Sequence, residues 1–298
     1  MLTNKAWGGW SHCIELKNRN LELIVTTDVG PRIISLCAPG QQNMMCVVPE
    51  TSGLTGGDEW HIFGGHRLWH SPEAKPRSYA PDNGPVEAIE IEGGVKLVQP
   101  TEQETGIRKE IEITLHPEEA RVRVLHRMVN EGPWPVRLAV WALTVMAPGG
   151  LCAAPQTRRD TGLLPNRHVT LWPYAGMGDK RAMWGDRYIL LRNDPNAEGP
   201  FKYGISNEEG WGAYFVNDQL FVKHFAHNSG SEYPDYGCSF ETYTCDFMHE
   251  VESLSPLVTL EPGAKAEHLE KWELFANVAM PEFSEAAVDA ALKGRVLR

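Results

Sequence analysis

Several features that would place a protein in a functional class at first sight are missing from this 298-residue chain. No stretch of about 18 apolar residues is available to span a membrane as a helix, and the opening MLTNKAWGGWSHC lacks the apolar core of a secretory signal. Basic residues are few, because 28 Lys and Arg stand against 39 Asp and Glu, a formal net charge of −11. This charge disfavours nucleic acids and anionic membrane surfaces as partners. We expect a soluble, cytoplasmic protein with a small, neutral ligand.

Paired-cysteine and phosphate-loop motifs are missing as well. None of the six cysteines belongs to a C-x-x-C pair, which excludes zinc-ribbon and dithiol redox motifs. The glycine-rich segment 53–57 has neither the lysine nor the strand-to-helix context of a phosphate-binding loop. We therefore expect no nucleotide and no cofactor. We expect buried, reduced thiols at all six positions, Cys13, Cys37, Cys46, Cys152, Cys238 and Cys245.

Alternating apolar and polar residues are what the chain has in abundance. In Ile107–Leu115 the apolar residues Ile107, Ile111 and Ile113 fall on one side, with charged residues between them. A period of two predicts a half-buried antiparallel strand. Arg121–Asn130 repeats the pattern after the polar loop HPEEA, and residues 87–99 predict another hairpin that turns at 92–94.

Elsewhere, Gly, Pro, Asn and Asp bound short segments, a pattern that predicts an all-β protein. We expect one domain over residues 1–298, because β-sandwiches of this length often fold as single units. Only residues 283–297 have a helical pattern, with Ser284 as the N-cap. The irregular segment 149–200 carries four large aromatic residues that either wall a cleft or seal the end of a sandwich. Further short strands are expected at 21–26, 32–36, 136–145, 212–216, 220–224 and 257–260.

Three segments near the C-terminus carry a family resemblance: GCSFETYT at 237–244, SPLVTLEPG at 255–263 and KWELFA at 271–276. Their order and turn chemistry resemble the end of aldose 1-epimerases, in the galactose mutarotase superfamily. TTDVGPRIISL at 26–36 and HIFGGHRLW at 61–69 resemble earlier parts of the same proteins. The resemblance is to an uncharacterised branch of that superfamily. It implies a large antiparallel β-sandwich of the galactose mutarotase-like supersandwich type with a short C-terminal helix.

The resemblance also implies a chemistry, in which Glu241 of the Glu-Thr pair is the general base. Interconverting sugar anomers requires removing a proton from the anomeric hydroxyl and protonating the ring oxygen, so a carboxylate and an acid are needed. Aldose 1-epimerases carry the acid in an Asn-His motif. In this chain the corresponding segment, 137–150, has Trp141 and Thr144 and no histidine. Without the resemblance, Glu241 is a glutamate on the outer face of a strand.

Candidates for the missing acid lie in DEWHIFGGHRLWHSPE, residues 58–73. Histidine can donate a proton near neutral pH, Arg can fork onto vicinal hydroxyls, and Trp offers a flat face to sugar C–H groups. We predict His66 as the acid, although each histidine can equally be a hydrogen-bonded structural residue. Predicted substrate-binding residues are Arg67, His61, His70, Trp69 and Trp141.

Other polar residues leave alternatives open. Glu250 and Glu252 share strand parity and compete with Glu241 for the role of base. Asp235 either orients a hydroxyl or is a turn residue after Pro234. Lys202 either reaches the ligand, which would then carry an acidic group, or is a solvated strand charge.

A metal site is a further alternative in the same histidine-rich segment. His61, His66, His70 and Glu59 could supply ligands, but the spacing H-x4-H-x3-H matches no zinc template and H-E-x-x-H is missing. We therefore predict no metal.

The sequence thus predicts an aldose 1-epimerase-like enzyme with a small-molecule carbohydrate as its partner. A non-catalytic carbohydrate-recognition protein is the main rival, because a fold does not dictate a function. A lyase or hydrolase that acts on sugars with the same scaffold is the third possibility.

Overall fold

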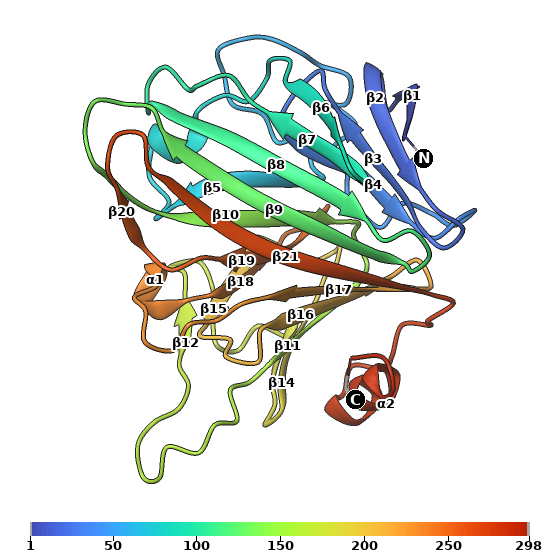
Figure 1. Ribbon diagram of the computed structural model, residues 1–298. Helices are drawn as coiled ribbons and strands as arrows, with labels where there is room; N and C mark the ends of the chain where they lie inside the picture. Colours follow the sequence, from blue (N-terminus) through green and yellow to red (C-terminus); the bar gives the residue numbers. More distant parts are fainter. Residues whose placement is uncertain (1, 297–298) are drawn as a thin grey trace.

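The computed structural model describes residues 2–296 and consists mainly of two large antiparallel sheets (Figure 1). The all-β prediction is confirmed. The first sheet contains, in spatial order, β1 (Leu2–Trp7), β2 (Trp10–Lys17), β3 (Glu22–Thr26), β4 (Arg32–Cys37), β5 (His66–Ser71), β10 (Val136–Met146), β19 (His249–Leu254), β18 (Phe240–Thr244), β15 (Phe201–Ile205) and β12 (Val169–Leu171), with β20 (Val258–Leu260) paired to β10 outside this path.

The second sheet covers one face of the first. It contains, in spatial order, β13 (Ala182–Trp184), β14 (Tyr188–Arg192), β11 (Leu151–Pro155), β16 (Trp211–Val216), β17 (Gln219–Phe225), β21 (Lys265–Ala276), β9 (Arg121–Asn130), β8 (Ile107–Leu115), β7 (Gly94–Val98) and β6 (Glu87–Ile91). The predicted strands Ile107–Leu115 and Arg121–Asn130 have the expected bounds, and the hairpin predicted at 87–99 is β6 and β7.

The main core lies between the sheets and follows the two-residue period of the strands. On β10, Leu138, Val140 and Met146 belong to this core, together with residues of both sheets. Trp141 and Leu143 alternate with them and belong to a separate apolar cluster on the other face. The first sheet is therefore buried on both faces over its central strands, which is where a site can form. All six cysteines are buried and unpaired, as expected.

The predicted C-terminal helix is present but shorter than expected. It is α2 (Glu285–Leu292), and Ser284 caps it by accepting a hydrogen bond from the backbone N–H of Ala287. Val288 and Leu292 pack on apolar residues of the second sheet, so the helix covers the outer face of that sheet. Leu297, the last residue of the predicted helix, lies outside the described residues. Within residues 2–296, no helix is long and apolar enough to cross a membrane.

Segment 149–200 is more regular than the sequence indicated, because β11, β12, β13 and β14 lie within it. Its four aromatic residues divide between the two proposed roles. Trp172 and Tyr174 wall a cavity on the first sheet. Trp184 packs against Tyr203, and Tyr188 against Trp211, so these two belong to the packed sandwich.

Two very short helical turns complete the described chain. They are η1 (Arg77–Tyr79) and α1 (Pro234–Gly237). Inside α1, Asp235 and Tyr236 have left-handed backbone angles, with φ values of 52° and 65°. This segment is therefore a tight turn leading into β18, which fits the alternative of Asp235 as a turn residue.

Candidate functional site

Charged and aromatic side chains lie on the face of the first sheet that is turned away from the second sheet, because side chains alternate between the two faces of a strand. Arg67 on β5 is the register partner of Leu143 on β10, which pairs in turn with Glu252 on β19. Glu252 pairs with Glu241 on β18. Residues on this face of the five central strands are Arg67, Trp69, Trp141, Leu143, Glu250, Glu252, Glu241, Tyr243 and Lys202.

Two glycines allow the backbone and side chains to approach closely here. A Cβ at Gly65, which precedes β5 with a φ of 68°, would lie 2.2 Å from the carbonyl oxygen of Ile33. Gly204 faces Glu241 across β15 and β18, and a Cβ there would lie 3.2 Å from Cγ of Glu241. Gly65 thus brings Arg67 into the sheet, and Gly204 makes room for the Glu241 side chain.

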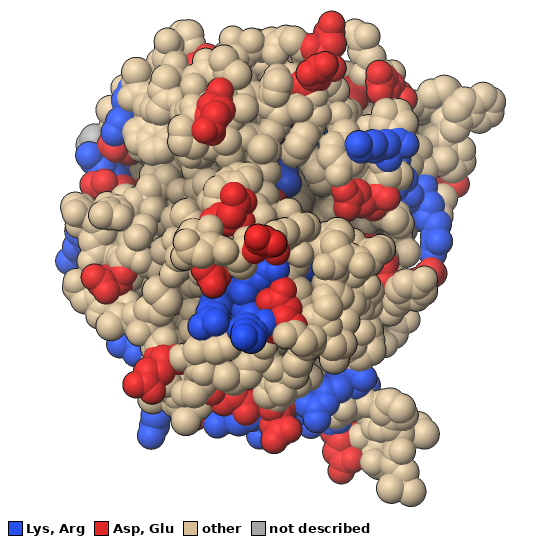
Figure 2. All heavy atoms as spheres, turned by 180° about the vertical axis from the view of Figure 1, so that it is seen from behind, with Lys and Arg blue, Asp and Glu red and all other residues tan. Residues whose placement is uncertain are grey.

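A cavity of about 350 Å³ lies over these strands. Loops supply its upper walls, with Trp60, Glu73 and Tyr79 from the first half of the chain and Trp172 and Tyr174 from the second. The remaining lining residues are Ile62, Arg67, Trp69, Trp141, Leu143, Pro200, Lys202, Tyr243, Met248 and Glu250. Figure 2 shows the molecule from behind, where acidic and basic side chains are interspersed in a largely uncharged surface.

Arg67 lies at one side of the cavity and is only 3% exposed. Its Nη2 donates to Oε1 of Glu250 at 3.0 Å, and its guanidinium lies 4.7 Å from the ring centre of Trp69 and 5.8 Å from that of Trp60. Nε and Nη1 of Arg67 and Nε1 of Trp60 are buried without a partner. This side of the cavity therefore offers N–H donors that an acceptor on a ligand would satisfy.

Lys202 lies at the other side, between two indole rings. Its Nζ is 4.7 Å from the ring centre of Trp141 and 4.6 Å from that of Trp172. The same nitrogen lies 2.8 Å from Oε2 of Glu241 and 2.9 Å from Oε2 of Glu252. Burial favours the neutral amine, but the two carboxylates outweigh burial and raise the pKa of Lys202 well above its ordinary value.

Glu241 and Glu252 lie beneath Lys202 and have no exposed surface. Burial raises the pKa of Glu241 well above its ordinary range; Lys202 opposes the rise and Glu252 adds to it. Burial also raises the pKa of Glu252, against the effect of Lys202. Glu252 is better supported in its charged form, because Nε1 of Trp141 donates to its Oε2 at 2.8 Å. Neither glutamate lines the cavity directly, and Lys202 connects both to it.

The structure separates His66 from the cleft, which corrects its predicted pairing with Glu241. His66 precedes Arg67 on β5 and therefore points to the opposite face, into the layer between the sheets. There its Nδ1 lies 2.9 Å from Oγ1 of Thr144, and its Nε2 lies 2.6 Å from Nε2 of His126. Burial lowers the pKa of His66 well below its ordinary value. His66 is thus a neutral, buried residue and cannot reach a sugar above Glu241.

The other two predicted histidines do not line the cavity either. His70 shares the parity of His66, and its Nε2 faces Oε2 of Glu102 at 3.5 Å. His61 lies in the loop before β5 and packs edge-on against Phe63. The structure therefore does not place His61 and His70 among the residues that line the cavity, and their contact with a ligand stays a prediction. Of the predicted binding residues, the structure brings Arg67, Trp69, Trp141 and Lys202 together around the cavity.

Asp235 lies at the margin of the site. Its carbonyl oxygen accepts a hydrogen bond from Oγ1 of Thr170, and its charge contributes to the raised pKa of Glu241. It is near enough to act on Glu241 electrostatically but is not among the residues that line the cavity.

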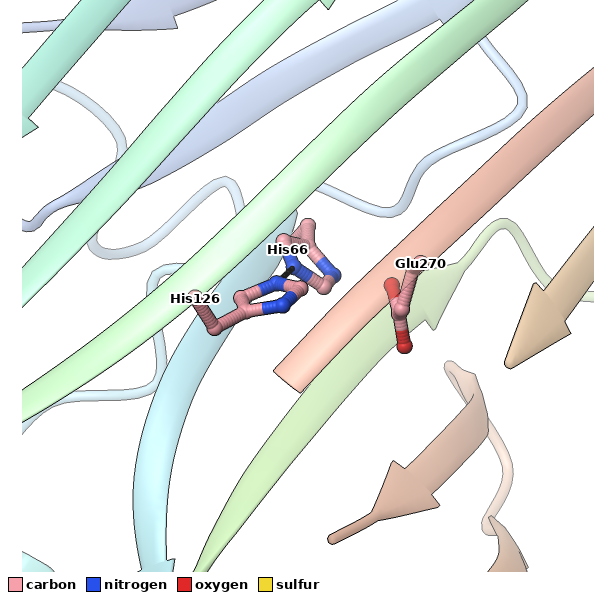
Figure 3. A group of neighbouring side chains, drawn as sticks. All are labelled: His66, His126 and Glu270. Carbon is pink, nitrogen blue, oxygen red and sulfur yellow. Dashed lines mark hydrogen bonds between the residues drawn. The ribbon is translucent and has the colours of Figure 1, made fainter. Parts of the chain in front are cut away.

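His66, His126 and Glu270 are the one group among the described residues with the proximity of a metal site (Figure 3). Their potential ligand atoms lie within 4.8 Å of one another. However, Nδ1 of His126 faces the carbonyl oxygen of His268 and must donate to it, so Nε2 of His126 accepts from His66. A proton already occupies the space between the two imidazoles.

Glu270 is saturated too, which removes the third ligand. It accepts hydrogen bonds from Ser253 and from Nε1 of Trp272, and its Oε1 lies 2.9 Å from Nζ of Lys223. The ammonium of Lys223 would repel a cation at this position. The group is therefore a buried polar network that links the two sheets. The ligand set considered from the sequence, His61, His66, His70 and Glu59, is not brought together as a metal group.

Sequence reasoning did not single out three residues that line the cavity, namely Glu73, Tyr79 and Tyr243, whereas Trp172 and Tyr174 belong to the aromatic set that it considered as cleft walls. Tyr243 could have been found, because it follows Glu241 by two positions on the same strand. The loop residues Trp172 and Tyr174 had only an aromatic composition to mark them. Glu250 was recognised as a competitor of Glu241, and it does line the cavity.

Comparison with known proteins identifies the architecture. No protein-family model and no curated protein sequence matches the chain. Among solved structures, a provisionally assigned mutarotase from Salmonella typhimurium superposes with a TM-score of 0.59 at 10% identity, over 92% of this chain and 94% of that one. A provisionally assigned aldose 1-epimerase from Klebsiella pneumoniae gives a TM-score of 0.59 at 11% identity, over 96% and 84%.

A galactose mutarotase-like protein from Lactobacillus casei gives a TM-score of 0.56 at 13% identity, over 88% of this chain and all of that one. At such identities the likeness establishes the fold and leaves the activity open. This chain has the galactose mutarotase-like fold.

Proposed function

We propose that this protein binds a small carbohydrate in the cleft over the first sheet and interconverts its anomers, as an aldose 1-epimerase does. The observation that carries the proposal is the composition of the 350 Å³ cavity. Indole and phenol rings form its walls, while Arg67, Lys202 and Glu250 lie on its floor. Sugar hydroxyls both donate and accept hydrogen bonds, and sugar C–H faces stack on aromatic rings. A pyranose therefore matches both parts of the cavity.

In the proposed reaction, Glu241 accepts the proton of the anomeric hydroxyl. The C1–O5 bond then breaks with its electron pair on O5, O5 takes a proton from the ammonium of Lys202, and C1 becomes a carbonyl carbon. Rotation about C1–C2 and reversal of these steps return both protons and give the other anomer. Trp69, Trp141 and Arg67 hold the ring. Because its two carboxylates stabilise the charged form, Lys202 is a weak acid, and we expect a modest turnover rate.

Lys202 must move from Glu241 for this chemistry, since it covers the carboxylate. Its second ion pair makes such a move feasible, because the ammonium can stay beside Glu252 while a sugar hydroxyl takes its place at Glu241.

The test is NMR exchange spectroscopy on a panel of aldoses. We expect the wild-type protein to exchange anomers of at least one aldose faster than the spontaneous rate. Glu241→Gln should lower that rate by about 10²- to 10⁴-fold, the usual contribution of one acid–base group, and should still bind the sugar. The exposed Glu261→Gln is the matched control and should exchange as fast as wild type. Equal rates in Glu241→Gln and wild type would exclude Glu241 as the base.

A non-catalytic carbohydrate-recognition protein is the second candidate. The observation in its favour is that Glu241 is fully covered and held by Lys202. It predicts that a sugar binds while wild type and Glu241→Gln leave the spontaneous exchange rate unchanged. Calorimetry on the same panel of aldoses supplies the binding measurement.

A further inference from the structure

Glu241 and Glu252 form a cross-strand carboxyl pair with a single cation between them. They are direct register partners on β18 and β19, so both side chains leave the sheet on the same face at neighbouring positions. Nζ of Lys202, from β15, lies 2.8 Å from one and 2.9 Å from the other. All three side chains are at least nine-tenths buried.

The charges around this pair do not balance if both glutamates are ionised. Lys202 neutralises one carboxylate, and Arg67, the other cation at the cavity, is paired with Glu250. Lys223 lies on the far side of the sheet and is paired with Glu270. When two carboxylates share one buried site, their mutual repulsion strongly raises the pKa of one of them. The remaining groups that act on the pair are Asp235, Glu250, Cys238, Tyr174 and the N–H of Trp141.

We propose that Glu241 and Glu252 hold one proton between them and that Glu252 is a positioning residue that sets the pH at which Glu241 becomes a base. The inference rests on the proposed function only for the role of Glu241 as base. Glu252 is the member better suited to carry the charge, since it accepts from Trp141 and from Lys202. The shared proton therefore resides mainly on Glu241 at rest, and losing it switches Glu241 into its active form. Burial, which raises the pKa of both glutamates, acts in the same sense.

The direct test is ¹³C NMR of protein labelled at the glutamate side-chain carboxyl, titrated without any sugar. In wild type we expect the Glu241 and Glu252 resonances to shift together through one step well above the ordinary glutamate pKa. Glu252→Gln keeps the shape and the acceptor for Trp141 but removes the charge. This variant should lower the pH at which the Glu241 resonance titrates by at least about one unit, a tenfold change in proton affinity.

Two further variants test whether the shift comes from the pair itself. Glu250→Gln removes a charge two residues along the same strand, and we expect a smaller shift of Glu241, because Glu250 is held by Arg67. Trp141→Phe removes the donor to Glu252 and should move the proton from Glu241 towards Glu252, so it tests the pair if Glu252→Gln does not fold. Independent titration of the two carboxyls at ordinary values, or equal shifts in Glu250→Gln and Glu252→Gln, would overturn the proposal.

The activity measurement separates this inference from the proposed function. If anomer exchange is found, its rise with pH should follow the Glu241 step and should move to lower pH in Glu252→Gln. A shift of the NMR step without any anomer exchange would support proton sharing and reject the epimerase. Anomer exchange with the same pH profile in wild type and Glu252→Gln would support the epimerase and reject proton sharing.

Discussion

The charge state and the free hydrogen-bond donors of single side chains in the cleft depend on the residues that the sheet places beside them. Lys202 would be an ordinary strand lysine, yet it lies between two carboxylates and two indole rings. Arg67 is held by Glu250 through one nitrogen and keeps two others unpartnered. These are the two residues through which a ligand would meet the charged floor of the cavity.

At this scale we predict that Arg67→Lys weakens sugar binding. Lysine keeps the charge but loses the planar set of N–H donors, so the dissociation constant should rise by about 10- to 100-fold, or roughly 1.4 to 2.8 kcal/mol. Isothermal titration calorimetry with an aldose that binds wild type measures the effect. Arg137→Lys, at an exposed position outside the cavity, is the control. Unchanged affinity in Arg67→Lys would show that its free N–H groups do not contact the ligand.

Among elements, β17 is tied to the first sheet by a buried lysine. Lys223 donates to the carbonyl oxygens of Ala142 and Val251, and its Nζ lies 2.9 Å from Oε1 of Glu270. Burial lowers the pKa of Lys223, whereas Glu270 supports its charge. Together with Ser253 and the histidines of Figure 3, this pair forms a polar layer inside an apolar sandwich. Its role is structural, since all of these groups lie between the sheets.

We therefore predict a large loss of stability for Lys223→Met. The change leaves Glu270 as a buried charge without its cation and should lower the free energy of unfolding by about 3 to 5 kcal/mol. Urea denaturation measures it. The double variant Lys223→Met with Glu270→Gln should recover part of the loss, because no unpaired charge remains. A single variant as stable as wild type would show that the pair contributes nothing.

For the whole molecule, buried neutral histidines contribute to the response to acid. Burial lowers the pKa of His66 and His126, and lowers those of His249 and His268 to about 3. Each of these groups takes up a proton in the unfolded chain near pH 6.5 but stays neutral in the folded one. Stability is therefore complete above about pH 6.5 and is lost as the pH falls towards the folded values.

We predict a lower free energy of unfolding at pH 5.5 than at pH 7.5. A histidine with a folded pKa of about 3 and an unfolded pKa of about 6.5 contributes a loss of about 1.4 kcal/mol between pH 7.5 and pH 5.5. Glu241 and Glu252 oppose the trend, because their raised pKa values favour the folded state as the pH falls. Urea denaturation at both pH values gives the difference.

His249→Gln should reduce the pH-dependent loss of stability, whereas Gln103→Asn, at an exposed position without a titratable group, should leave it unchanged. Stability that is flat or rises between pH 7.5 and 5.5 would contradict the sign of the predicted effect.

The sequence by itself determined the fold class and many strands, because a half-buried antiparallel strand alternates apolar and polar residues and this alternation is visible in the sequence. Ile107–Leu115 and Arg121–Asn130 are of this kind. Strands such as β5 could not be predicted in this way, because both faces of β5 are buried and each face carries polar as well as apolar residues, so HRLWHS has no visible period.

Only the tertiary structure decided which polar residues share the cleft. His66 and Arg67 are neighbours in sequence, yet one strand step sends them to opposite faces, one to a histidine network and the other to the cavity. Lys202, Glu241 and Glu252 come from three strands and meet because those strands pair in one register. The GCSFETYT segment pointed to Glu241 as the candidate base. The cation that covers it and the carboxyl that shares its proton follow from strand pairing between distant parts of the chain, which local sequence patterns do not encode.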